Sequence, residues 1–210
     1  MMHDTVALGI TGASGIQYGL RLLECLLNSN RQVYLMITRA ARAVISLETD
    51  LKLPRMPADI ETYFKALYAA EDARLKMFGE EEWNSPLASG SGIVDAMIVC
   101  PCTMGSLAAI ATGTSNNLLE RAADVMLKER RKLILVPRET PFSEIHLENM
   151  LRLTRMGVVI LPANPGFYNR PKRVEDVVDH IVARILDHLE VEHQLQLRWG
   201  VGSETERGSR

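Results

Sequence analysis

Five short apolar runs recur along the chain, and each is followed by a segment with helical patterning. The runs are Thr5–Ile10, Gln32–Thr38, Val94–Cys100, Lys132–Val136 and Val158–Leu161. The segments after them are Ile16–Leu27, Arg39–Leu47, Met104–Ala111, Ser143–Arg155 and Val174–Leu189. Continuous apolar runs are typical of strands that are covered on both faces, as in parallel sheets. The alternation therefore predicts a single α/β domain with a doubly wound parallel sheet, Rossmann-like and of the flavodoxin-like kind.

Two stretches interrupt this alternation. The first spans residues 50–93, where we expect a helix over Ile60–Met77 followed by the polar tract GEEEWNSPLASGSG. The second is an expected helix over Asn117–Arg131, which precedes the fourth strand. A chain of 210 residues is long enough for one domain with a sizeable core. We expect that domain over residues 1–193 and a polar tail over residues 194–210.

Composition and motif content argue against several classes of function. A net charge of −2 and an aromatic content of 5% argue against binding nucleic acid through a basic or stacking surface. No apolar run approaches the roughly 20 residues that span a bilayer, and the first residues lack the basic patch of a signal peptide. We therefore expect a cytoplasmic protein without membrane contact. The histidines form no H-E-x-x-H pattern and the cysteines lack zinc-ligand spacing, so no metal site is expected.

The loop after the first strand carries a glycine-rich sequence at the edge of the sheet where ligands bind. Its glycines, in GITGASGIQYG, have G-x-x-G-x-x-G spacing and not the G-x-G-x-x-G of dinucleotide-binding loops. The stretch Gly12–Gly15 opens a helix whose free N–H groups favour an anion, although glycines that only make a tight turn give the same pattern. No acidic residue for a ribose stands at Thr38 or Arg39, after the second strand. The sequence therefore favours a mononucleotide over a dinucleotide.

Further candidates follow other strands or share one helix face. The stretch Pro101–Ser106 begins a helix with hydroxyls and a glycine, which suits helix capping and anion binding equally. Arg121 and Lys128 are seven residues apart, so they share a face that is either solvated or part of a site. Arg138 and Glu139 directly follow the fourth strand, where a surface salt bridge and a ligand contact are both consistent with the sequence.

Several longer motifs resemble those of the UbiX flavin prenyltransferases. They are GITGASG near the start, SLETD at 46–50, the run NNLLERAADVMLKERRKLILVPRETPFS, PGFYNRP at 165–171 and RWG at 198–200. The resemblance covers nearly the whole chain, and RAADVxLKERR followed by RETP is its most specific part. It implies a Rossmann-like flavoprotein that assembles as a dodecamer of four trimers.

The resemblance also implies an activity. Members of the family join a dimethylallyl group from dimethylallyl monophosphate to the N5 and C6 atoms of reduced FMN, without a metal. The prenylated FMN then serves UbiD-type decarboxylases, including the one in ubiquinone biosynthesis. FMN, dimethylallyl monophosphate and a UbiD-type decarboxylase are therefore the implied cofactor, substrate and recipient of the product.

Site residues are implied wherever this sequence matches the family's motifs. The implied FMN contacts are Gly12, Ala13, Ser14, Thr38, Thr103, Met104, Gly105, Ser106 and Arg138. The implied contacts to dimethylallyl phosphate are Tyr168 and Arg184, with Arg121 and Lys128 expected nearby. The implied catalytic residues are Ser14, Glu48, Glu139 and Trp199. We expect Lys128, Arg138, Arg184 and Tyr168 to form one cluster that holds the departing phosphate in place of magnesium.

Two alternatives to this function stay open. The first is an FMN-dependent decarboxylase of cysteine-type substrates, which resembles this chain around the flavin loops. Such enzymes use a histidine after the second strand, and residues 39–53 contain none. The second is a flavin carrier without chemistry of its own, for which the charged residues at 121, 128, 138 and 184 are more than storage requires.

Overall fold

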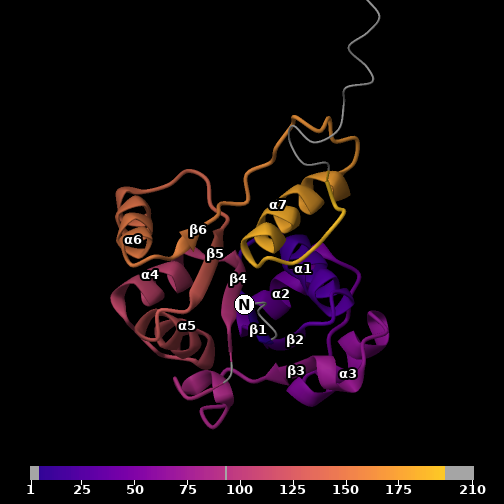
Figure 1. The fold of residues 1–210 in the computed structure, drawn as a ribbon, viewed down its shortest axis with the longest axis horizontal. Helices are drawn as coiled ribbons and strands as arrows, with labels where there is room; N and C mark the ends of the chain where they lie inside the picture. Colours follow the sequence, from indigo (N-terminus) through magenta and orange to yellow (C-terminus); the bar gives the residue numbers. More distant parts are fainter. Residues whose placement is uncertain (1–4, 93, 197–210) are drawn as a thin grey trace, which may run out of the picture.

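The computed structural model describes residues 5–92 and 94–196, and it shows a sheet of parallel strands between two layers of helices (Figure 1). The strands are β1 (Thr5–Ile10), β2 (Gln32–Ile37), β3 (Leu75–Phe78), β4 (Ala96–Cys102), β5 (Lys132–Pro137) and β6 (Val159–Ile160). Their order across the sheet is β3-β2-β1-β4-β5-β6, and each neighbouring pair is parallel. The chain reverses its direction of winding between β1 and β4, which is where doubly wound sheets bind ligands. The predicted fold class is confirmed.

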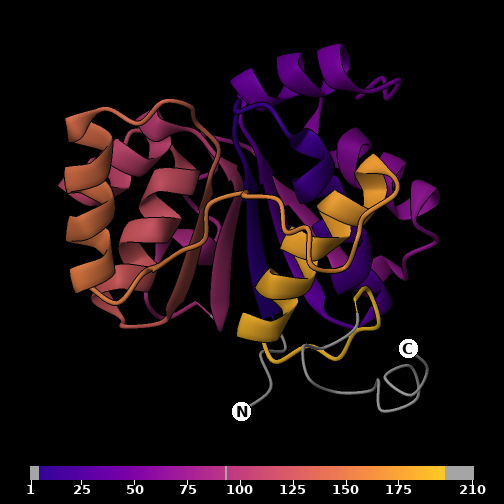
Figure 2. The ribbon, with the colours of Figure 1, turned by 90° about the horizontal axis from the view of Figure 1, so that it is seen from above.

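Helices cover both faces of this sheet (Figures 1 and 2). One face carries α1 (Ile16–Asn28), α2 (Arg39–Glu48), α3 (Pro57–Leu67) and α7 (Val174–His188). The other carries α4 (Met104–Thr112), α5 (Leu118–Lys128) and α6 (Glu144–Arg155). Two short 3-10 helices, η1 (Asp72–Arg74) and η2 (Pro86–Ala88), lie in the connections before β3 and β4. Within the described part of the chain, no helix is long and apolar enough to cross a membrane.

The central strands are buried on both faces because their alternate side chains enter two separate cores. In β4, Ile98 packs in the core beneath α1 and α7, whereas Met97 and Val99 pack in the core beneath α4 and α5. Each of these three side chains is 0% exposed. The period of two along a strand therefore accounts for the continuous apolar runs in the sequence.

The expected helix over Ile60–Met77 is confirmed as far as Leu67 and wrong beyond it, because Leu75–Met77 belong to the edge strand β3. Helix α3 ends at Leu67, and Ala69 then adopts a positive φ of 48° that a continuing helix does not allow. Leu75 and Met77 are buried side by side with β2, while Lys76 between them is exposed. The other differences are boundaries: β4 begins at Ala96 and runs to Cys102, and α5 ends at Lys128.

Candidate active site

The loops after β1, β2 and β4 are tied together at the carboxyl edge of the sheet. The buried Thr11 hydroxyl donates to the Pro101 carbonyl over 2.7 Å and accepts from the Thr103 N–H over 2.8 Å. On the other side, the Thr38 N–H donates to the Ile10 carbonyl over 3.0 Å. These bonds fix the three loops relative to one another at the switch point between β1 and β4.

Arg138 joins the loop after β5 to the same edge. Its backbone N–H donates to the Cys102 carbonyl over 3.4 Å, and its side-chain Nε donates to the Ser14 carbonyl over 3.2 Å. The guanidinium is exposed, so its remaining N–H groups face the space above the loops. The next residue, Glu139, is half-buried and accepts a hydrogen bond from the Thr140 N–H over 3.1 Å.

Glu48, the last residue of α2, caps the start of α1. Its Oε2 accepts from the N–H groups of Gly15 and Ile16 over 2.9 and 3.1 Å. Partial burial raises the pKa of Glu48, but the Ser14 side chain, these two N–H groups and the charge of Arg138 together bring that pKa below its usual value. The carboxylate is therefore the anion that the first glycine loop binds. A phosphate at these N–H groups would have to displace it.

Gly12 has a packing role that accounts for part of the glycine pattern. A Cβ at this position would lie 2.6 Å from the Ala40 Cβ, which is closer than such atoms approach. Gly15, by contrast, adopts a φ of 95° as it leads into α1. The alternative that these glycines make a tight turn is therefore correct in part: Gly12 lets α1 and α2 begin close together, and Gly15 supplies the positive φ before α1.

The starts of α2 and α4 carry hydroxyl caps. The Thr38 hydroxyl accepts from the Ala41 N–H over 3.2 Å, and the Thr103 hydroxyl accepts from the Ser106 N–H over 3.0 Å. The Thr103 and Ser106 hydroxyls also bond each other over 3.0 Å. Gly105 is exposed, and the nearest atom to a Cβ there lies 3.9 Å away, so the surface above it is open.

Glu80 also reaches this edge, and the sequence reasoning missed it. Its Oε2 accepts from the Arg39 N–H over 2.9 Å, and its carbonyl accepts from the Leu118 N–H over 2.8 Å. Glu80 therefore joins the starts of α2 and α5. The signal that identifies Glu80 is its place just after the edge strand β3, a segment for which the sequence pattern predicts a helix.

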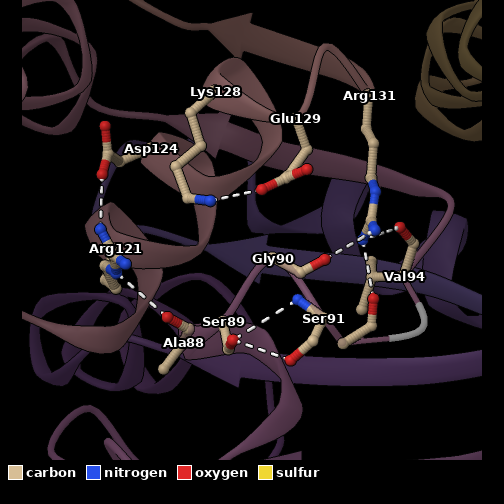
Figure 3. Close-up of polar contacts among 11 residues, drawn as sticks. Ala88, Ser89, Gly90, Ser91, Val94, Arg121, Asp124, Lys128, Glu129 and Arg131 are labelled. Atoms are coloured by element: carbon tan, nitrogen blue, oxygen red, sulfur yellow. Dashed lines mark hydrogen bonds and ion pairs between the residues drawn. The ribbon is translucent and has the colours of Figure 1, made fainter.

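Arg121 and Lys128 lie on the face of α5 that packs against η2 and the loop after it (Figure 3). The Arg121 Nε donates to the Ala88 carbonyl over 3.1 Å, and its Nη1 pairs with Asp124 over 2.7 Å. Lys128 pairs with Glu129. Lys128 ends α5 just before β5 begins, which places it near the amino edge of the sheet. The six residues of β5 span about 20 Å, so within one chain Lys128 is far from Arg138.

Of the remaining implied substrate contacts, Arg184 is also away from the flavin loops. Arg184 pairs with Asp187 over 2.8 Å in the last turns of α7. That end of the helix lies beside the amino end of β5, because the Lys132 Nζ donates to the His188 carbonyl over 2.5 Å. Tyr168 lies in the loop between β6 and α7 and is 84% exposed. Trp199 lies outside the described residues.

One chain thus brings together most of the predicted residues but not all of them. The carboxyl edge holds Gly12, Ala13, Ser14, Thr38, Glu48, Thr103, Met104, Gly105, Ser106, Arg138 and Glu139. The expected single cluster of Lys128, Arg138, Arg184 and Tyr168 does not form within one chain. The contacts of all these residues to FMN and to the prenyl donor stay predictions.

Comparison with known proteins gives consistent results. The flavoprotein family model matches residues 1–186. Flavin prenyltransferase UbiX of Pseudomonas aeruginosa is 52% identical over 197 residues, which are 94% of either chain. The crystal structure of AnUbiX (PadA1) in complex with FMN and dimethylallyl pyrophosphate is 39% identical with a TM-score of 0.83, and the match covers 96% of this chain and 100% of that one.

A second solved structure and a distant one complete the comparison. The dodecameric FMN-dependent UbiX-like decarboxylase from Escherichia coli O157:H7 is 43% identical with a TM-score of 0.81, over 93% of this chain and 98% of that one. The peptidyl-cysteine decarboxylase EpiD, at 15% identity over 79% of this chain and 83% of that one and a TM-score of 0.52, shares the fold alone. Because half of its residues are shared with a flavin prenyltransferase over nearly the whole length, the chain belongs to the UbiX family of flavin prenyltransferases.

Proposed function

We propose that this protein joins the dimethylallyl group of dimethylallyl monophosphate to the N5 and C6 atoms of reduced FMN. The observation that carries the proposal is the meeting of Ser14, Glu48, Arg138 and Glu139 at the edge where the strand-end loops converge. We further propose that a UbiD-type decarboxylase receives the prenylated FMN. The three free cysteines are consistent with the proposed cytoplasmic location.

The donors at this edge fit a flavin mononucleotide. Because Glu48 already occupies the start of α1, the phosphate of FMN belongs at the hydroxyl-bearing starts of α2 and α4, near Thr38, Thr103 and Ser106. Ser14 and Arg138, which are joined by a hydrogen bond, would then hold the ring system. When bound, reduced FMN supplies the electron-rich N5 and C6 positions that the prenyl group joins.

The chain's cations have a defined task in this reaction. When the allylic C–O bond breaks, negative charge develops on the phosphate and positive charge on the allylic carbon. Arg138, Lys128 and Arg184 hold the departing phosphate, together with the Tyr168 hydroxyl. One such positioned donor is typically worth a factor of about 10² to 10³ in rate. Trp199 offers a π face to the developing positive charge, worth up to about 2 kcal/mol where water is excluded.

Closing the new ring releases a proton, and Glu139 is the proposed group that accepts it. Glu139 is half-buried and lies next to Arg138, whose side chain bonds the Ser14 carbonyl. We propose that Glu139 and Ser14 pass the proton toward the bound phosphate, and the Arg138–Ser14 hydrogen bond, which ties the two loops together, supports this. Glu48, with its lowered pKa, stays ionised at neutral pH and favours positive charge nearby.

A second copy of the chain is needed to complete this site. Lys128 and Arg138 are separated by the length of β5 within one chain, yet both are assigned to one phosphate. The E. coli relative is dodecameric, which supports an assembly in which one copy supplies Lys128 and Arg121 to the flavin edge of another. Mixing Lys128→Ala with Arg138→Ala protomers under conditions of subunit exchange tests this. Shared sites predict recovery of about a quarter of the wild-type activity, and sites within one chain predict none.

The activity itself is tested by incubating the protein with reduced FMN and dimethylallyl monophosphate without oxygen. The proposal predicts a flavin product with one added prenyl mass, formed at the same rate with a chelator and with added magnesium. A parallel incubation with dimethylallyl diphosphate shows which donor is used. Loss of CO2 from a peptidyl-cysteine substrate instead supports the decarboxylase alternative. Tight FMN binding without any product supports the carrier.

A further inference from the structure

One arginine fastens the loop between η2 and β4 at three points (Figure 3). The Arg131 Nη1 donates to the carbonyls of Gly92 and Val94 over 2.8 and 3.0 Å, and its Nη2 donates to the Gly90 carbonyl over 2.9 Å. A planar guanidinium makes this set of bonds with one rigid group, whereas a lysine ammonium on its flexible stem does not reproduce that fork. Within residues 88–92, Arg131 therefore holds the backbone at Gly90 and Gly92.

The backbone of Arg131 is held in place on both sides. Its N–H donates to the Met126 carbonyl over 2.9 Å and so closes the end of α5, after Arg130 has turned with a φ of 54°. The next residue, Lys132, begins β5 and pairs with Ala96 of β4. The backbone that carries the Arg131 side chain is thus fixed between the end of α5 and the start of β5. The loop that the side chain binds has fewer such restraints than this helix and strand.

The fastened loop in turn touches the two cations of α5. The Ala88 carbonyl accepts from the Arg121 Nε over 3.1 Å. At Gly90 a Cβ would lie 2.0 Å from the Glu129 Oε1 and 2.7 Å from the Lys128 Nζ, so the loop backbone runs directly against the Lys128–Glu129 ion pair. At Gly92 a Cβ has no room beside the Pro86 carbonyl. The loop therefore has little freedom to shift without moving Arg121 and Lys128.

We propose that Arg131 is a positioning residue for the phosphate of the prenyl donor. It fixes the 88–92 loop, and that loop sets the positions from which Arg121 and Lys128 reach the phosphate. The inference rests on the proposed function, because it takes Arg121 and Lys128 as phosphate contacts. Arg131 itself touches backbone carbonyls of the loop, so its effect on the reaction is indirect.

The test compares Arg131→Gln and Arg131→Lys with Arg130→Gln, which removes the same charge from the exposed neighbouring residue. Four quantities are measured on the assembled protein: the KM and kcat for dimethylallyl monophosphate at saturating reduced FMN, the Kd of FMN, and the deuterium exchange of residues 86–94. For Arg131→Gln we expect KM to rise about tenfold or more, with kcat changed less and the FMN Kd unchanged. Exchange in the loop becomes faster, Arg131→Lys is intermediate, and Arg130→Gln matches the wild type.

Either of two results overturns the inference: an unchanged KM in Arg131→Gln, or loop exchange no faster than in the wild type. If Arg131→Gln no longer binds FMN, the test uses Arg131→Lys, which keeps the charge. The inference then requires that Arg131→Lys shows a raised KM with normal FMN binding. A merely structural role of Arg131 would weaken FMN binding and raise the KM for the prenyl donor together. A wild-type protein that transfers no prenyl group contradicts the proposed function instead, and the exchange data then still report whether Arg131 holds the loop.

Discussion

Glu48 offers the sharpest test of how the flavin edge is built, because one carboxylate supports both the fold and the site. Glu48→Gln keeps the size of the side chain and removes its charge from the N–H groups of Gly15 and Ile16. The lost interaction with the helix dipole is worth about 0.3–1 kcal/mol, and weakening two charge-assisted bonds adds a similar amount. Because the side chain is only half-buried and water screens it, we expect a loss of about 1 kcal/mol in the free energy of unfolding at pH 7.

The loss must depend on pH in one direction. The pKa of Glu48 in the folded protein is lowered, so its stabilisation is fully present above the unfolded value of about 4.3 and disappears as pH falls through the folded value. Urea unfolding at one fixed protomer concentration, at pH 7 and in steps down to about pH 3, measures this. The difference between wild type and Glu48→Gln shrinks toward zero at the acid end. A difference that is equal at all pH values, or absent at pH 7, refutes the reasoning.

A matched control separates stability from chemistry. Partial burial raises the pKa of Glu61 on α3, but hydrogen bonds from the Lys65 side chain and the Met77 N–H bring it below its usual value. Glu61→Gln should therefore lose stability with the same dependence on pH. It lies by the edge strand β3, so prenyl transfer and FMN binding stay at wild-type levels. Glu48→Gln, in contrast, slows transfer.

Three further substitutions test the surroundings of the site. Gly12→Ala places a methyl group 2.6 Å from the Ala40 Cβ, so the start of α2 must shift at a cost of about 1–3 kcal/mol; we expect the FMN Kd, from quenching of flavin fluorescence, to rise at least tenfold. In Gly105→Ala the new methyl group meets no atom closer than the Thr103 hydroxyl at 3.9 Å, and the helix gains up to about 1 kcal/mol of helix propensity. We therefore expect Tm to stay the same or rise, and a fall in Tm would show that the surface at Gly105 is not open. Glu139→Gln retains FMN and stalls after some prenyl transfer, as absorbance and mass of the flavin show; full turnover by this variant removes Glu139 from the mechanism.

The sequence predicted the central strands well and the edge strand poorly, for one physical reason. Strands β1 and β4 are enclosed by helices on both faces, so their own residues record their environment as continuous apolar runs. β3 has a strand neighbour only in β2, and its inward residues Leu75 and Met77 continue a spacing that also fits the apolar stripe of α3. Whether that short segment becomes a strand depends on β2, some forty residues away in the sequence. A local pattern does not contain that information.

The site shows the same limit in a different form. The seven-residue spacing of Arg121 and Lys128 correctly predicted one shared helix face. The spacing did not show which edge of the sheet that face lies near. The order of helix and strand along the chain does show it. A residue just before a parallel strand lies at the amino edge, while residues just after a strand lie at the carboxyl edge with the ligand. Lys128 precedes β5 and Arg138 follows it, so one strand separates two residues that share a proposed task. When residues assigned to one reaction lie at opposite edges of the same sheet, we expect the site to form between two copies of the chain.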